Sequence, residues 1–252
     1  GFDLEHSDFR GRAVFHRSFI AGEQVQDGNG HGTHCIGTAC GALAPQPLPR
    51  YGIAHQSEIL AGKVLSNAGS GPDRGILAGI DWAVTNGASV ISMSLGSPVL
   101  PGEAPSEVYE QVAARLLQRG VLIVAAAGND SRRPTAISPV GRPANCPSIM
   151  SVGAVDQNLK IAFFSNRGSN PNGGAIDIVA PGVGILSSVP MSRRVGRLDG
   201  TSMATPHVAG IAALYAQNTG LKGAALWMRL SQTALRLPLP SSDCGIGLVQ
   251  AS

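Results

Sequence analysis

Five short and almost continuously apolar runs constrain the fold of this chain more than any other feature of its sequence. A run that lacks the apolar–polar alternation of a half-exposed strand is typical of a strand covered on both faces. The five runs are SEILAGKVL (57–65), ASVISMSLG (88–96), VLIVAAAG (121–128), SIMSVGAV (148–155) and AIDIVAPG (175–182). They predict five buried strands.

Amphipathic helical patterns lie between several of these runs. The two clearest cover residues 73–87 and 105–120, and each ends at a glycine. Their apolar stripes are Ile76, Ile80 and Val84 in the first, and Val108, Val112, Leu116 and Leu117 in the second. This order predicts an α/β fold with a doubly wound, mostly parallel central sheet and helices on both faces.

The composition fits a globular protein and narrows its partners. Hydrophobic residues make up 43% of the 252 residues and charged residues 14%, so the chain can bury a sizeable core. We see no internal repeat or linker and expect residues 1–252 to form a single domain. A formal net charge of +3 with scattered basic residues gives no reason to expect nucleic acid as a partner. No apolar run reaches the ~18 residues that span a bilayer, so we expect no membrane partner.

The four cysteines indicate neither a zinc site nor a particular disulfide. They show no C-x-x-C pair and no zinc-finger spacing, and they permit up to two disulfides without requiring one. Cys35 lies in an apolar, helical segment, where a buried free thiol is expected. The cysteines are Cys35, Cys40, Cys146 and Cys244.

Three unusual segments fall at predicted strand ends or helix starts, where chemistry gathers in parallel sheets. They are DGNGHGTHCIGTACG (27–41), VAAAGND (124–130) and LDGTSMATPHVAGIAALYA (198–216). Taken alone, Ser202 in the third segment reads as a helix N-cap. Together with His31 and Asn129 it reads as a nucleophile, since a histidine can take its proton and an amide can bind an oxyanion.

The segments HGTH (31–34), AAGN (126–129) and GTSMATPHVAG (200–210) resemble the signature segments of the subtilisin-like serine proteases, the subtilases. The resemblance extends to the closing segment GIGLVQA (245–251). It implies a serine endopeptidase that acts on extended peptide or protein substrates. It also implies a secreted protein, a monomer, whose partners can include its own N-terminal segment or propeptide.

The resemblance assigns roles residue by residue. His31 is similar to the general base, Ser202 to the nucleophile and Asn129 to the side-chain donor of the oxyanion hole. The residues expected to bind substrate are Ser94, Leu95 and Gly96 as a pairing edge, Ala127 and Gly128 as a pocket wall, and Gly141 near the pocket floor. Gly141 would leave this pocket roomy, and Asp130 at its rim is either a charge-tuning group or a plain loop carboxylate.

The family's triad aspartate has no counterpart in this sequence. The family segment Asp-Ser/Thr-Gly matches GFDLEHSDF only from Gly1 onward, which places the expected aspartate two residues upstream. Asp3, Asp8 and Asp27 are poor substitutes by position. We therefore expect an N-terminally incomplete chain that lacks its first strand and, as it stands, is poorly active.

The resemblance implies no cofactor or metal for catalysis. His31 and His34 could share a metal by spacing, but a structural role is expected for His34 and His207. Asp199 reads as a tolerated variant of the family's usual asparagine. The proline-rich segment 42–52 replaces the family's usual calcium loop and offers few side-chain ligands, so that site is expected to be absent, although structural calcium elsewhere stays possible.

Two other functions stay open beside the endopeptidase. One is a catalytically impaired or silent domain that binds peptides, although it would have no chemical need for His31, Ser202 and Asn129 together. The other is a peptide transamidase or macrocyclase that uses the same acyl-enzyme, although no large insertion that could shield the site from water is evident.

Overall fold

Four of the five apolar runs form one parallel sheet in the computed structural model, which describes residues 1–171, 173–191 and 193–251. All neighbouring strands pair in parallel, and every residue of β4 and β5 is buried, as expected for strands covered on both faces. The strands, in sheet order, are β3 (Val90–Met93), β4 (Leu122–Ala126), β5 (Met150–Val155) and β6 (Ile178–Pro181).

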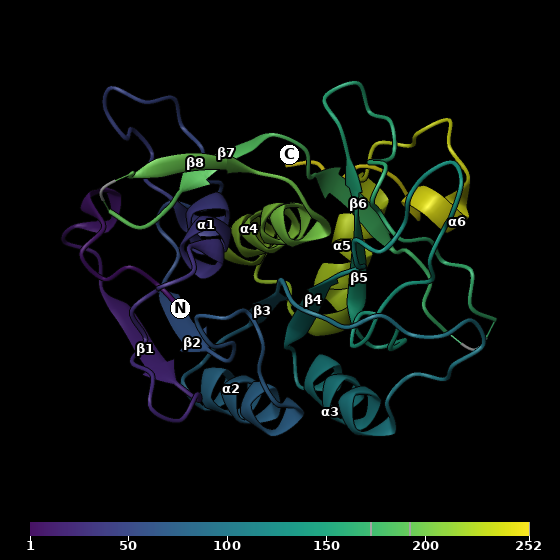
Figure 1. Ribbon diagram of the computed structural model, residues 1–252, viewed down its shortest axis with the longest axis horizontal. Helices are drawn as coiled ribbons and strands as arrows, with labels where there is room; N and C mark the ends of the chain where they lie inside the picture. Colours follow the sequence, from purple (N-terminus) through teal and green to yellow (C-terminus); the bar gives the residue numbers. More distant parts are fainter. Residues whose placement is uncertain (172, 192, 252) are drawn as a thin grey trace. The chain divides into compact units, whose positions relative to one another are not determined.

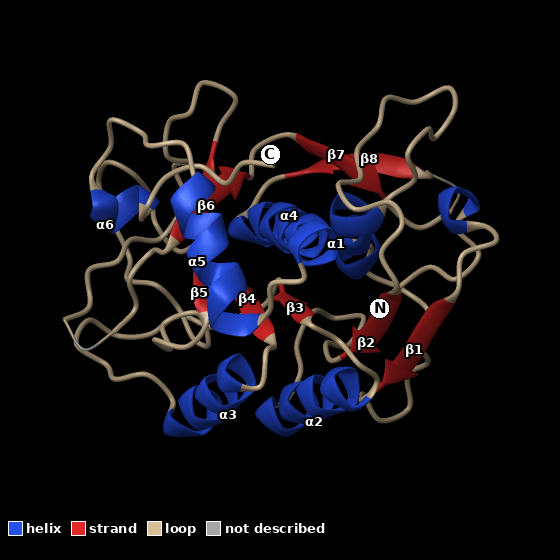
Figure 2. Cartoon of the chain, turned by 180° about the vertical axis from the view of Figure 1, so that it is seen from behind, coloured by secondary structure: helices blue, strands red, loops and turns tan. Residues whose placement is uncertain are grey.

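This sheet is the centre of the larger of two compact units, here called unit 2, which comprises Ser89–Ile185 and Leu198–Ser252. Its long helix α4 contacts all four strands, and α3 lies on the opposite side of β3 and β4 (Figures 1 and 2). The predicted α/β class with a parallel sheet and helices on both faces is confirmed. The helices of this unit are α3 (Glu107–Gln118), α4 (Thr201–Thr219), α5 (Gly223–Thr233) and α6 (Ser241–Cys244).

The apolar stripe predicted for α3 is wrong at Val108, whereas Leu116 is buried as predicted and Val112 and Leu117 are half-buried. Val108 is 55% exposed, whereas Tyr109, Ala113 and Leu116 are buried. These three residues follow the i, i+4, i+7 spacing of one helix face. The small side chain of Ala113 permits close packing at the centre of that face, and the large ring of Tyr109 is 3% exposed. The predicted stripe therefore holds at Leu116 and is misplaced at its first residue, where Tyr109 faces inward instead of Val108.

Unit 1 comprises Gly1–Ala88 and Leu186–Arg197. The fifth predicted strand, β2 (Ile59–Lys63), pairs in parallel here with β1 (Val14–Ser18), which the sequence did not predict. Both helices of the unit, α1 (His31–Cys40) and α2 (Asp73–Thr85), contact β2. A short 3-10 helix, η1 (Ser7–Phe9), precedes β1.

The core of unit 1 is built from Phe2, Phe9, Ile59 and Ala61, which are all buried. The rings of Phe2 and Phe9 meet edge to face with centroids 5.0 Å apart. The remaining two-stranded sheet consists of β7 (Ile185–Ser188) and β8 (Val195–Leu198). The single domain over residues 1–252 and the missing first strand stay predictions.

All four cysteines are free thiols, so none of them forms a disulfide bond. Cys146 and Cys244 are buried, and Cys35 and Cys40 on α1 are half-buried. Across residues 1–171, 173–191 and 193–251, no helix is both long and apolar enough to cross a membrane.

Candidate active site

Ser202 is the second residue of α4, so the reading of this serine as an N-cap is wrong. The N-cap is Gly200, whose φ of 150° and ψ of 158° suit a residue without a side chain. A Cβ at Gly200 would lie 3.5 Å from both the Asn129 Nδ2 atom and the Ser202 backbone nitrogen. These are ordinary van der Waals distances, so glycine is needed here for its backbone conformation rather than for space. The N-terminus of α4 favours negative charge at this point.

Asn129 is held in one orientation by Thr201, the neighbour of Ser202. The Thr201 backbone N–H donates to Asn129 Oδ1 over 2.8 Å, and the Thr201 hydroxyl donates to the same oxygen over 2.9 Å. Both donors act on the oxygen, so the amide must turn its nitrogen away from Thr201. The Nδ2 atom has no hydrogen-bond partner within the described part of the chain, and the residue is exposed. An amide N–H is thus left to serve an external acceptor beside Ser202.

Gly128 makes the turn that presents Asn129 at the end of β4. Its φ is 111°, and a Cβ there would come within 2.3 Å of the Nδ2 atom of buried Asn166. The Gly128 N–H also donates to the Thr201 hydroxyl over 3.2 Å. The turn after β4 and the first turn of α4 are consequently joined by three hydrogen bonds, in which backbone N–H groups as well as a side-chain hydroxyl act as donors.

The predicted substrate edge lies next to this turn. The Ser94 hydroxyl donates to the Ser202 carbonyl over 2.7 Å, which ties the residue after β3 to the backbone of Ser202. Beyond it, Ser97 and Arg142 exchange two backbone hydrogen bonds of 2.9 and 3.0 Å. Leu95 is half-buried and Gly96 is exposed, so the backbone between Ser94 and Ser97 is accessible for strand pairing.

Gly141 connects the two predicted walls of the pocket. Its N–H donates to the carbonyl of Ala127 over 2.9 Å, and a Cβ at Gly141 would come within 2.7 Å of the Ser97 carbonyl oxygen. A side chain at this position would therefore push apart the two chain segments that form the walls. The glycine is needed for close packing of backbone, and the predicted roominess of the pocket stays a prediction.

His31 lies in unit 1 as the first residue of α1, and Asp27 fixes the turn that leads to it. One Asp27 oxygen accepts from Asn29 N and Gly30 N, and the other accepts from the backbone N–H and the hydroxyl of Thr33. Burial would raise the pKa of Asp27, but these hydrogen bonds outweigh it and hold the pKa below its ordinary value. Asp27 is thus a helix-capping carboxylate.

The other two upstream carboxylates are also engaged elsewhere in unit 1. Asp3 accepts from the Gln26 side chain and from the N–H groups of Met191 and Glu5. Asp8 accepts from Tyr51 and forms an ion pair of 2.6 Å with Arg194. No hydrogen bond joins either carboxylate, or Asp27, to the His31 ring in the described residues.

The immediate neighbour of the His31 ring is Cys35, one turn further along α1. The sulfur lies 4.0 Å from both ring nitrogens. The neighbouring Cys35 sulfur makes the largest contribution that raises the pKa of His31, burial opposes this, and the Asp27 charge adds to the increase. The histidine therefore holds its proton to a higher pH than an exposed imidazole does.

The remaining sequence candidates have structural contacts. His34 is fully buried, and its carbonyl accepts from the Ser187 hydroxyl. His207 Nδ1 bonds to the Met203 carbonyl over 2.8 Å. The Asp199 carboxylate accepts from Gly184 N over 2.5 Å. Asp130 accepts from the Asn166 amide over 2.9 Å, which makes it part of the turn after β4.

Two positioning residues escaped the sequence reasoning. Thr201 orients Asn129, and Asn166 braces the same turn by accepting from Asp130 N and Ser131 N while donating to the Pro139 carbonyl. The position of Thr201 directly before Ser202 could have indicated its role. Asn166 follows an unremarkable loop, and nothing in the sequence indicates it.

Comparison with known proteins gives a consistent answer over almost the whole chain. Residues 1–247 match the family model described as the subtilase family. Over 236 residues the chain is 42% identical to Subtilisin Savinase of Lederbergia lenta, which covers 93% of this chain and 81% of the relative. It is equally identical to the M-protease of Shouchella clausii (strain KSM-K16), of which it spans only 57%. Among solved structures, Sphericase superposes with a TM-score of 0.83 at 30% identity, covering 100% of this chain and 89% of that one.

Proposed function

The chain belongs to the subtilase family, and we propose that it is a serine endopeptidase that hydrolyses peptide bonds through an acyl-enzyme. The observation that carries the proposal is the Asn129 amide, whose oxygen is bound by Thr201 and whose nitrogen is left to donate beside Ser202. A helix cap or a packing role requires no such one-sided arrangement. Stabilisation of an oxyanion does.

In the proposed mechanism, neutral His31 takes the proton of the Ser202 hydroxyl as the oxygen attacks the substrate carbonyl. The negative charge moves to the carbonyl oxygen, where Asn129 Nδ2 and the Ser202 backbone N–H stabilise it. The imidazolium then gives its proton to the leaving amine, and the acyl group remains on Ser202. Water then attacks the acyl carbonyl as it loses a proton to His31, the bond between the acyl group and the Ser202 oxygen breaks, and the imidazolium returns the proton to that oxygen as the acid product leaves. The carboxylate that would orient His31, expected upstream of Gly1, is part of this proposal.

We propose extended peptide or protein segments as substrates, paired along Ser94, Leu95 and Gly96 in the manner of an added strand. Ala127, Gly128 and Gly141 would surround the side chain before the scissile bond. The protein would be secreted and act as a monomer.

We propose that catalysis needs no metal and that segment 42–52 holds no calcium ion. This segment contains no Asp or Glu, and Arg50 already donates to the Gly52 and Ile53 carbonyl oxygens over 2.8 and 2.5 Å. A guanidinium bound to these carbonyl oxygens disfavours a calcium ion there, because Ca²⁺ requires six to eight oxygen ligands.

The silent binding domain and the transamidase are separated from the endopeptidase by covalent labelling followed by product analysis. A fluorophosphonate probe is expected to label the protein, and Ser202→Ala should abolish labelling while Ser169→Ala, an exposed loop control, should not. Labelling that survives Ser202→Ala would refute the nucleophile assignment. Intact product masses then distinguish hydrolysis, which adds water, from transfer to an amine, which does not.

A further inference from the structure

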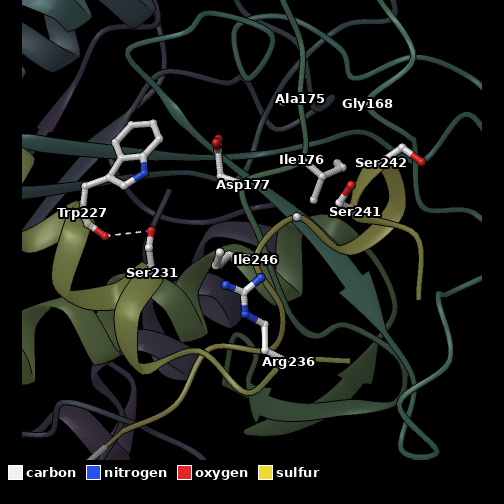
Figure 3. A pocket seen from close by; sticks show the side chains of 11 residues that line it. Gly168, Ala175, Ile176, Asp177, Trp227, Ser231, Arg236, Ser241, Ser242 and Ile246 are labelled. Atoms are coloured by element: carbon white, nitrogen blue, oxygen red, sulfur yellow. Dashed lines mark hydrogen bonds between the residues drawn. The ribbon is translucent and has the colours of Figure 1, made fainter. Parts of the chain in front are cut away.

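Unit 2 contains a cavity of about 580 Å³ that shares no lining residue with the proposed catalytic machinery. It lies among the segment before β6, helix α5 with the segment after it, and helix α6 (Figure 3). Its volume falls within the range of small-molecule sites, about 300–1,000 Å³. The polar side chains in its wall are Asp177, Trp227, Ser231, Arg236, Ser241 and Ser242.

The carboxyl group of Asp177 is only partly satisfied by the protein. One oxygen accepts from the Ser151 N–H over 2.7 Å, and no described side chain donates to the other. Burial raises the pKa of Asp177 to about 7, against the opposing effect of the Ser151 hydrogen bond. The cavity therefore holds an acidic group that lacks a cationic partner.

The opposite charge in the wall is also unpaired. Arg236 is exposed, and neither an ion pair nor a hydrogen bond of its guanidinium occurs among residues 1–171, 173–191 and 193–251. The Trp227 indole N–H also lacks a hydrogen-bond acceptor among these residues. The hydrogen bond drawn at Trp227 runs from the Ser231 hydroxyl to the Trp227 backbone carbonyl (Figure 3). The cavity thus offers an anion, a cation and an aromatic face that do not satisfy one another.

We propose that this cavity binds a small zwitterion, namely an amino acid or short peptide, with its ammonium group at Asp177 and its carboxylate at Arg236. A guanidinium is suited to a carboxylate because its N–H groups match both oxygens. A carboxylate and an indole that line the same cavity suit an ammonium group, which gains from the charge and from the ring face. A ligand with one charge would leave one of the two groups unmatched.

The ammonium end makes the binding depend on pH in a defined direction. Below pH 7 Asp177 is mostly neutral, and a bound ammonium must displace its proton, so affinity rises with pH. For a pKa of about 7, the affinity should increase about fivefold between pH 6 and pH 7. Two other charged groups lie on the lining helices. Asp243 of α6 pairs with Arg133 and Arg167, and the Arg229 guanidinium of α5 lies over the Tyr215 ring, with its buried Nε atom lacking a hydrogen-bond partner among the described residues.

Calorimetric titration with diglycine tests the proposal on the Ser202→Ala protein, so that binding is scored without turnover. N-acetyl-diglycine lacks the ammonium group and diglycinamide lacks the carboxylate, and each is expected to bind about tenfold or more weakly. Arg236→Gln should remove the preference for diglycine over diglycinamide, while Arg119→Gln, an exposed arginine at the end of α3, should leave it unchanged. Asp177→Asn, which keeps an oxygen for the Ser151 N–H, should remove the pH dependence.

Equal affinity for diglycine and both blocked forms would overturn the proposal, as would no measurable diglycine binding at 50 mM. Retention of the full preference in Arg236→Gln would also overturn it, and this exposed residue carries little risk to folding. None of these results bears on the proposed endopeptidase, which is scored separately by probe labelling at Ser202.

Discussion

Replacing Asn129 by aspartate should separate the two functions of its side chain. The oxygen of this side chain accepts two hydrogen bonds from Thr201, and the nitrogen is left for the proposed oxyanion. Aspartate keeps an oxygen for Thr201 but loses the donor and places a negative charge toward the developing oxyanion. We therefore expect a folded protein that is a poor catalyst.

The magnitudes follow from the contacts. Loss of one oxyanion donor lowers kcat by about 10²–10³, a value that comes from a relative in this family, and equals about 2.7–4 kcal/mol. The added charge should bring Asn129→Asp to the upper end of that range. Its folding should be nearly unaffected, because an acid near the N-terminus of α4 contributes about 0.3–1 kcal/mol of stabilisation.

Asn129→Leu should instead damage both functions. It removes the donor and also leaves the Thr201 N–H and hydroxyl without their acceptor, which costs about 2 kcal/mol for two hydrogen bonds. In a chain of this size that corresponds to a decrease in Tm of about 4–8 °C. Asn158→Asp, in an exposed turn, introduces the same charge as a control and should change neither kcat nor Tm.

The assay combines kcat and KM for a chromogenic peptide with thermal unfolding of the complete protein. The pattern expected for Asn129→Asp is a large decrease in kcat, an unchanged KM and an unchanged Tm. An unchanged kcat would refute the donor role of Asn129. A Tm as low as that of the leucine variant would refute the inference that Thr201 binds the oxygen and leaves the nitrogen free.

Three further changes test the surrounding structure. Cys35→Ala should lower the pKa of His31, because the contribution of the sulfur is lost. The acid limb of the kcat/KM profile should then move to lower pH. An unmoved acid limb would contradict the influence of Cys35 on His31. Gly128→Ala should lower the free energy of unfolding in urea by about 2–4 kcal/mol, because of strain at φ 111° and a clash with buried Asn166. As a control, Gly87→Ala has a positive φ but open space around the Cβ, and it should lower the free energy of unfolding by about 1 kcal/mol. Burial favours protonated Asp243, but hydrogen bonds from its two arginine partners outweigh burial and lower the pKa of Asp243. The stabilisation of the folded protein by ionised Asp243 is therefore present above pH ~4 and is lost on acidification. Asp243→Asn should flatten the decrease in unfolding free energy between about pH 5 and 2.

The strands of the sheet could be predicted because a strand that is buried on both faces has an almost continuously apolar sequence. The run VLIVAAAG became β4 with every residue buried, and its end placed Asn129 where parallel strands place chemistry. The inward-facing residue at the start of α3 could not be predicted, because Val108 and Tyr109 are adjacent and both hydrophobic. Only packing decides which of them faces inward.

Side-chain orientation was the other limit. The motifs indicated that Asn129 carries chemistry, but only the two hydrogen bonds from Thr201 show which end of its amide points outward. Asp177 and Arg236 are 59 positions apart, and no spacing rule connects them; the folded chain brings both into one cavity wall.

The bonds between Thr201 and Asn129 join residues that are 72 positions apart in the chain. The arrangement of the Asn129 amide beside Ser202 therefore cannot exist until β4 and the start of α4 have come together. A protease that acquired its activity earlier in folding would cleave its own unfolded neighbours during synthesis. A partly folded copy in which β4 and the start of α4 have not met therefore contains both Asn129 and Ser202 but lacks the oriented amide donor, and we expect it to be inactive.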